Sequence, residues 1–217
     1  MNYLAERREE EKERRRSEIV DAALALYAEK GWDAVTMDQV ARKARLSRAL
    51  VYVYFRDKDD LLFAITARGF EELRERFIAA AAGEALGADK VEAIGHAYVQ
   101  FQRDLPHLFD ACARFHAHDA SGRDTQHVNE ISCIACGDAV MEVLHGALRH
   151  GIADRSIRAD IGDPNVVVMT LWAFTHGLIQ IMTNKADAMA LHGVTVEILS
   201  EQSFAMFRHM LGAPPKT

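Results

Sequence analysis

The stretch from Val35 to Leu62 constrains the fold more than any other part of the sequence. Two short helical segments are expected in it, with Thr36 placed to cap the first and Ser47 to cap the second. Gln39 lies three residues after Thr36 and completes a capping box, which is a strong signal for a helix start. An aromatic run, residues 52–55, closes the second segment. Two short capped helices joined by a few residues are typical of a helix-turn-helix, which fits a DNA major groove.

The charge of this stretch suits DNA, although the charge of the whole chain does not. The chain has a formal net charge of -6, and binding to phosphate needs a basic surface. Between Ala34 and Lys58, however, only Asp38 and Asp57 oppose the bases Arg42, Lys43, Arg45, Arg48, Arg56 and Lys58. From Leu61 onward, 13 Lys and Arg stand against 19 Asp and Glu. A small basic DNA-binding head on an acidic body is therefore predicted.

The rest of the chain has helical periodicity and no alternation typical of strands. The charged arm, residues 1–16, is expected to extend a first helix that ends near Lys30, before Gly31. Further helices are expected at Asp57–Ala82, Asp89–Arg103, Pro106–His118, Asp124–His150, Pro164–Lys185 and Val194–Leu211. We therefore predict an all-α chain with a three-helix DNA-binding domain over residues 1–60 and a helical bundle over residues 61–217.

The composition predicts a cytoplasmic protein. The N-terminal residues lack the apolar core of a signal peptide. The three cysteines, an odd number, make a disulfide framework improbable. Residues 165–184 carry no charge and are long enough to span a bilayer, but Thr170, Thr175, His176 and Gln180 favour a helix buried among other helices. No membrane partner is expected.

The head resembles the DNA-binding domain of the TetR family of bacterial transcriptional regulators. The likeness rests on Thr36, the spacing of VARKARLS, the aromatic run Tyr52-Val53-Tyr54-Phe55, Lys58 and the Leu61-Leu62 pair, and it covers about the first third of the chain. A looser likeness continues in HGIADRSIRADIGDP and WAFTHGL. The resemblance implies an all-helical homodimer whose larger C-terminal domain serves ligand binding and dimerisation. It further implies a repressor that binds a palindromic operator and is released by a small-molecule effector.

The residues expected to contact DNA combine this resemblance with the physics of helix starts. Thr36 offers a hydroxyl and free backbone N–H groups to a phosphate. Arg48, just inside the second helix, is placed to reach a guanine edge in the major groove. Tyr52 and Lys58 resemble family positions that contact the DNA backbone. The full predicted set is Thr36, Arg45, Ser47, Arg48, Ala49, Leu50, Tyr52, Tyr54 and Lys58.

Three positions depart from the family pattern. Arg45 stands where many members have glycine, and a left-handed residue other than glycine costs on the order of 1 kcal/mol. A differently shaped turn is therefore expected. Ala49 and Leu50 replace the frequent Gly and Thr or Ser, which removes one polar contact to DNA. We expect readout to depend on Arg48 and on an apolar contact to a thymine methyl group.

The C-terminal bundle contains aromatic and polar residues that could line an apolar cavity for a small molecule. The alternative that each aromatic residue simply fills the core stays open. The candidate ligand-binding residues are Phe101, Phe109, Cys112, Phe115, His116, Trp172, His176 and Gln180. The helix at 164–185 and the last helix have apolar surface that one chain would struggle to cover. Pairing both with their symmetry mates predicts a four-helix dimer interface.

Two other classes of function have weaker support in the sequence. A metal- or thiol-sensing regulator would use His116, His118, Cys133 and Cys136, but His116 and His118 point to different faces of a helix. An enzyme has little support: Glu142 and His145 form one Glu-x-x-His pair, whereas a di-iron bundle needs two. No nucleophile or phosphate-loop motif occurs. We predict a protein that is not an enzyme and has no metal site or cofactor.

Overall fold

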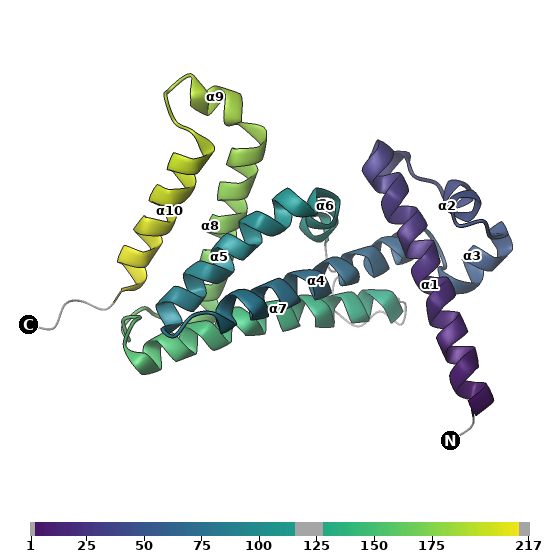
Figure 1. Cartoon of the computed structure of the whole chain (residues 1–217), viewed down its shortest axis with the longest axis horizontal. Coiled ribbons are helices and arrows are strands. Elements are labelled where there is room, and N and C mark those ends of the chain that lie inside the picture. Colours follow the sequence, from purple (N-terminus) through teal and green to yellow (C-terminus); the bar gives the residue numbers. More distant parts are fainter. Residues whose placement is uncertain (1–2, 116–127, 213–217) are drawn as a thin grey trace, which may run out of the picture. The chain divides into compact units, whose positions relative to one another are not determined.

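The computed structural model describes residues 3–115 and 128–212, which form helices joined by turns and short loops (Figure 1). No β-strand forms within these ranges, which confirms the predicted all-α class. The elements are α1 (Tyr3–Lys30), the 3-10 helix η1 (Trp32–Ala34), α2 (Met37–Lys43), α3 (Arg48–Tyr54), α4 (Lys58–Ala82), α5 (Gly87–Asp104), α6 (Pro106–Arg114), α7 (Val128–Asp154), α8 (Pro164–Asn184), α9 (Ala186–Ala190) and α10 (Val196–Leu211). The long predicted helices lie close to their expected ranges. The helix expected to reach His118 instead ends at Arg114.

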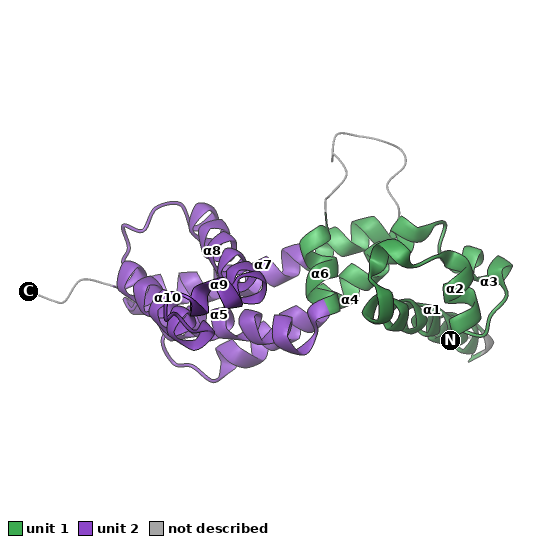
Figure 2. Ribbon diagram, turned by 90° about the horizontal axis from the view of Figure 1, so that it is seen from above, with its two compact units in different colours: residues 1–70, 107–136 green, residues 71–106, 137–217 purple. Residues whose placement is uncertain are grey.

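The helices form two compact units (Figure 2). Unit 1 comprises residues 1–70 and 107–136, and unit 2 comprises residues 71–106 and 137–217. Helices α4 and α7 each begin in unit 1 and end in unit 2. Helix α6 and the start of α7, which follow the predicted domain boundary at residue 60, therefore belong to the same unit as the N-terminal helices.

Side-chain caps fix the starts of α2 and α3. The backbone N–H of Thr36 donates to the side-chain oxygen of Gln39 (3.0 Å), and the Thr36 hydroxyl accepts from the backbone N–H of Gln39 (3.4 Å). This is the predicted capping box of α2. The Ser47 hydroxyl accepts from the backbone N–H of Leu50 at the start of α3 (3.2 Å). Both predicted caps are confirmed.

The turn between α2 and α3 is closed by two reverse hydrogen bonds. Arg45 N donates to Arg42 O (3.2 Å), and Leu46 N donates to Ala41 O (2.9 Å). This is a Schellman motif, whose left-handed position is usually glycine. Arg45 occupies that position with φ 58°. The turn therefore keeps the left-handed conformation at a cost of about 1 kcal/mol, and the exposed Arg45 side chain adds a positive charge beside α3.

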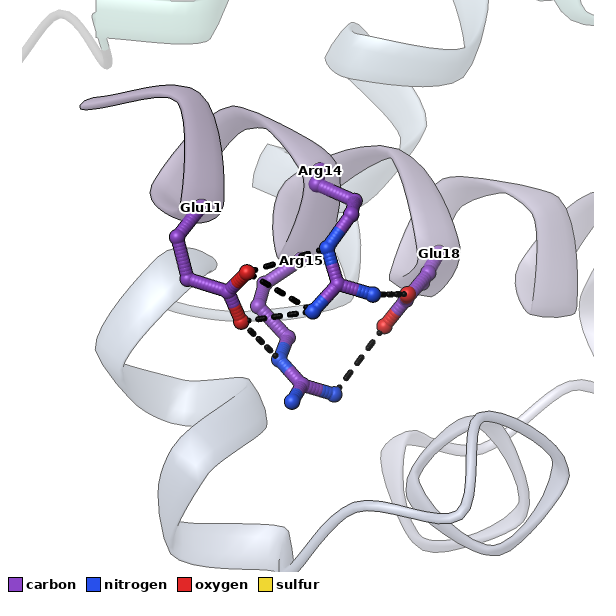
Figure 3. Close-up of polar contacts among 4 residues, drawn as sticks. All are labelled: Glu11, Arg14, Arg15 and Glu18. Carbon is purple, nitrogen blue, oxygen red and sulfur yellow. Dashed lines mark hydrogen bonds and ion pairs between the residues drawn. The ribbon is translucent and has the colours of Figure 1, made fainter. Parts of the chain in front are cut away.

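Residues 3–16 of the charged arm form the first half of α1, which confirms that the arm extends the first helix. Its acidic and basic side chains pair with one another along the helix (Figure 3). Arg14 pairs with Glu11 and Glu18 at 2.7 Å each, and Arg15 pairs with Glu11 at 3.0 Å. Hydrogen bonding from Arg14 lowers the pKa of Glu11. Arg14 and Arg15 are therefore neutralised by acidic side chains of the same helix.

In unit 2 the start of α5 is capped by residues at the end of α7. Asp154 accepts from the backbone N–H of Gly87 (2.7 Å), and the Ser156 hydroxyl accepts from the backbone N–H of Ala88 (3.0 Å). Hydrogen bonds from Ser156 and from Gly87 lower the pKa of Asp154 to about 2. The ionised carboxylate is thus the form that holds the helix start.

We expect the replacement Asp154→Asn to reduce stability at neutral pH and to change its dependence on acid. A carboxyl group with a lowered pKa in the folded state stabilises the fold above its ordinary pKa, and this contribution is lost as the pH falls through the folded value. The difference in unfolding free energy between wild type and variant should therefore shrink between about pH 4 and about pH 2. Urea unfolding of both proteins at several pH values measures it. A difference that stays constant over this range would contradict the assignment.

Two helices, α7 and α8, are long and apolar enough to cross a membrane when judged by length and composition alone. Core helices of soluble proteins pass the same test. Within unit 2, α8 packs against α5 and α10.

Candidate DNA-binding site

Helix α3 is anchored on one side and exposed on the other. Val51 and Phe55 are fully buried, and Leu50 and Tyr54 are half-buried. The exposed residues are Arg48, Ala49, Tyr52 and Val53. Successive helix residues are about 100° apart, so these four form one continuous face. This face is the part of unit 1 best placed to meet base edges.

Arg48 begins this face and is held in position by two neighbours. Its Nε lies 3.0 Å from a carboxylate oxygen of Asp38, and its guanidinium lies 5.5 Å from the centre of the Tyr52 ring. Hydrogen bonding to Tyr52 and attraction to Asp38 raise the pKa of Arg48. The Arg48 side chain is 64% exposed, so its ion pair with Asp38 is weak. Arg48 can therefore leave Asp38 and contact a nucleobase. The arrangement suits bidentate contact with guanine.

Lys58 lies at the first position of α4 and is also held. Its Nζ donates to the backbone oxygen of Asp33 (3.3 Å) and lies 5.1 Å from the centre of the Trp32 ring. The cation is therefore restrained near the start of a helix, where phosphate contacts are common. Thr36, which the sequence predicts as another phosphate contact, is exposed at the start of α2.

Most of the basic side chains that the sequence places between Ala34 and Lys58 are exposed on the surface of unit 1. Arg42, Lys43, Arg45, Arg48 and Arg56 are exposed, and Lys58 is half-buried. Asp57 pairs with Arg56 at 3.3 Å, as Asp38 does with Arg48. Since each acid is paired with one base, the surface around α3 keeps an excess of positive charge.

A buried carboxylate fixes the chain directly after α3. Asp60 is only 7% exposed, and it accepts from the backbone N–H of Arg56 (3.0 Å) and from the Asn129 amide (2.8 Å). The Asn129 oxygen accepts in turn from Arg16 of α1 (2.6 Å). The guanidinium of Arg16 lies 5.5 Å from the centre of the Phe55 ring. The end of α3 is thus tied to α1 and to the first turn of α7, a link that sequence reasoning missed.

A second polar link joins α6 to the N-terminal helices. The hydroxyl of the buried Tyr27 donates to Asp110 (2.5 Å), which also accepts from Arg114 (2.9 Å). Arg114 further contacts Asp33 at 3.4 Å. Burial, together with the bond to Asp110, raises the pKa of Tyr27 and keeps its hydroxyl a donor. Helix α6 is therefore fixed to η1, whose residues Trp32 and Asp33 also contact Lys58.

Two family models match the chain. Residues 19–65 match the model for bacterial regulatory proteins of the tetR family, and residues 91–209 match the model for a tetracyclin repressor-like C-terminal domain. The second match covers more than half of the chain. The chain belongs to the TetR family. The TetR resemblance and the all-α fold inferred from the sequence are confirmed. The prediction of a transcriptional regulator and not an enzyme is confirmed as well.

Similar curated regulators match over only part of this chain. The regulator HbdR of Aromatoleum sp. strain CIB is 49% identical over 51 residues, which are 24% of this chain and 22% of HbdR. The repressor KstR of Rhodococcus jostii is 42% identical over 62 residues, 29% of each chain. The matched segments therefore span well under two thirds of these relatives.

A solved structure extends the likeness to the whole fold. FadR from Bacillus subtilis, in complex with stearoyl-CoA, superposes with a TM-score of 0.66 at 15% identity. The match covers 90% of this chain and 98% of FadR. At this identity the comparison supports the TetR fold alone.

The predicted ligand-binding residues of this TetR protein divide between the two units. Phe109, Cys112 and Phe115 belong to unit 1, whereas Phe101, Trp172, His176 and Gln180 belong to unit 2. His116 lies outside the described residues. In unit 1, Phe115 packs edge-on against Phe63 (6.1 Å) and Phe70 (6.0 Å). Their role in ligand binding remains a prediction.

In unit 2 the structure adds Tyr98 to the predicted group. Its hydroxyl lies 2.9 Å from Nδ1 of His176 and accepts from the indole N–H of Trp172 (3.4 Å). Phe77 packs edge-on against the Tyr98 ring. Burial lowers the pKa of His176, which favours the neutral ring. Phe101 is fully buried and Gln180 is exposed, and their role in ligand binding stays a prediction.

Cys112 and Cys133 offer little to a metal- or thiol-sensing site. Burial raises the pKa of Cys133 to about 12 and raises that of Cys112 as well. The reactive thiolate is therefore strongly disfavoured. No group of three or more metal-binding side chains occurs among the described residues, and His116 and His118 lie outside them.

Proposed function

We propose that this TetR regulator is a cytoplasmic repressor that binds a palindromic DNA operator as a homodimer and is released by a small-molecule effector. The observation that carries the proposal is the exposed face of α3, where Arg48 and Tyr52 stand in basic surroundings. The similar repressor KstR supports repression over activation. Thr36, Arg45, Ser47, Tyr52, Tyr54 and Lys58 are proposed to position the duplex, with Arg48, Ala49 and Leu50 nearest the bases.

The homodimer is proposed to form through α8 and α10. These helices pack together in unit 2, and Phe174 meets Phe207 edge-on at 4.0 Å. Much of their apolar surface is nevertheless exposed. The exposed apolar residues are Val166, Met169, Trp172, Phe174 and Ile181 on α8 and Ile198, Met206 and Met210 on α10. Pairing with a second copy would bury them in a four-helix interface and set two α3 helices about 34–36 Å apart along DNA.

Release by an effector is proposed as a population shift. The effector would favour a spacing of the DNA-binding heads that fits the operator poorly. The size of the shift is set by the difference in effector affinity between the conformation that fits the operator and the one that does not. Helices α4 and α7, which belong to both units, are the proposed transmitting elements. Because FadR is solved with stearoyl-CoA, long-chain acyl-CoA thioesters are the first effectors to screen.

The proposal is tested by selecting bound sites from random DNA with the full chain. A palindrome should emerge, and its affinity should fall steeply with salt. A screen of small molecules on the complex should then find one that releases the DNA. Binding without sequence preference would overturn the proposal.

We expect Arg48→Ala to lower affinity for the selected operator by about 1–3 kcal/mol and to relax preference at one base position. The reason is the loss of a bidentate contact to guanine. Lys58→Ala is the matched comparison: it should weaken binding to all sequences alike and reduce the salt dependence by about one charge. Fluorescence anisotropy with selected and scrambled duplexes separates the two. Unchanged operator binding by Arg48→Ala would assign base readout to another residue.

A further inference from the structure

Val53 is the most exposed large apolar side chain of α3. It is 76% exposed, and it is β-branched, which makes it less favourable in a helix than alanine. Because the Val53 side chain stays largely exposed, the folding of unit 1 buries little of its apolar surface. Exposed valines occur elsewhere, as at Val128 with 82%, so exposure alone carries no conclusion. What distinguishes Val53 is its place on the candidate base-reading face.

The exposed face of α3 consists of two rows. Arg48 and Tyr52 are four residues apart and form a polar row, in which the guanidinium lies against the aromatic ring. Ala49 and Val53 have the same spacing and form a second, wholly apolar row about 100° further round the helix. A helix that enters the groove by this face presents both rows to the base edges together.

The two rows can recognise different chemistry. Arginine reads hydrogen-bond acceptors, whereas Ala49 and Val53 have no hydrogen-bonding side-chain group. The only apolar group on a natural base edge in the major groove is the 5-methyl group of thymine. The surrounding basic side chains, Arg45 and Arg56 among them, provide the positive charge that attracts the duplex to this face. An apolar row in basic surroundings is therefore matched to thymine.

We propose that Ala49 and Val53 form a thymine-methyl contact, and that Val53 determines preference for thymine at a fixed position of each operator half-site. This inference rests on the proposed operator binding and goes beyond it, because it names a residue and the chemical group that it reads. The sequence predicts an apolar contact to a thymine methyl group and places Ala49 and Leu50 among the DNA-contacting residues. Leu50 is half-buried beside Val51, and Val53 is the more accessible residue.

The test uses the full chain and the palindrome selected from random DNA. Each symmetric pair of thymines is replaced in turn by deoxyuridine, which lacks only the methyl group. At one position the wild-type protein should bind about fourfold more weakly per half-site, or about fifteenfold for the palindrome, because one methyl group is no longer buried. Equal affinity for thymine and deoxyuridine at every position would overturn the proposal.

Two variants assign the effect to Val53. Val53→Ala should bind the thymine and deoxyuridine operators with nearly equal affinity at that position, while its melting temperature stays close to that of the wild type. Val128→Ala, which shortens a similarly exposed valine on α7, should discriminate as the wild type does. If Val53→Ala discriminates like the wild type, the methyl group is read elsewhere and the proposal is wrong. If no palindrome is selected at all, the proposed operator binding fails first, which is a distinct result.

Discussion

Replacing Met206 by glutamate is expected to convert the proposed dimer into monomers and to weaken binding to the palindrome by about 100-fold or more. Met206 is 62% exposed on α10, so the change should leave the monomer folded. In a four-helix interface, the same position would bury a carboxylate from each copy without a partner. An unpaired buried charge costs about 3–5 kcal/mol, which corresponds to more than a 100-fold loss of association.

The measurement is the mass in solution by sedimentation, alongside operator affinity. Met206→Leu is the matched control, since it keeps an apolar side chain of similar volume and should remain a dimer. The glutamate variant should still bind a single half-site weakly, because α3 lies in the other unit. A dimer that persists in Met206→Glu would show that α10 is not at the interface.

Much of the fold could be predicted because its signals are local. The capping box of Thr36 with Gln39 and the cap at Ser47 each act over three residues, and the structure contains both. Helices α1 and α4 end at Lys30 and Ala82, as the glycines that follow them predict, whereas α7 runs through Gly151 to Asp154. The short elements η1 and α9 were not predicted, since a single turn leaves too little periodicity to recognise.

The parts of the site that sequence reasoning missed depend on distant residues. Asn129 meets Asp60 across 69 positions, and Asp110 meets Tyr27 across 83. No pattern in one sequence connects such pairs. Val53 was missed for a different reason. It shares a helical row with Ala49, a predicted contact, but exposure rather than spacing reveals that its side chain faces outward.

The Arg45 turn illustrates a third limit. The absence of glycine favoured a changed turn, yet the Schellman hydrogen bonds form with arginine in the left-handed position. A cost near 1 kcal/mol is small beside the packing of Val40 and Val51 on either side of the turn, both fully buried. Local preference is overridden here because burial contributes more.

Gly87→Ala is expected to destabilise the protein by about 3 kcal/mol, through the contact between α5 and α7. A Cβ atom at Gly87 would lie 2.0 Å from the backbone nitrogen and 2.2 Å from the Cα of Gly151. Both are backbone atoms, so no side chain can rotate away, and the two helices must separate. That movement would also lengthen the Gly87–Asp154 hydrogen bond that caps α5. In a chain of this length the melting temperature should fall by roughly 6–12 °C.

Gly146→Ala is the matched control for this prediction. Gly146 lies on α7, and nothing is within 4 Å of a Cβ atom built there. Because alanine is the better helix former, this variant should gain up to about 1 kcal/mol instead. Opposite signs for one added methyl group on neighbouring helices would isolate the steric cause from any general effect of losing a glycine. If Gly87→Ala melts like the wild type, α5 and α7 are not in contact at Gly151, and the cap that Asp154 gives to α5 would need another explanation.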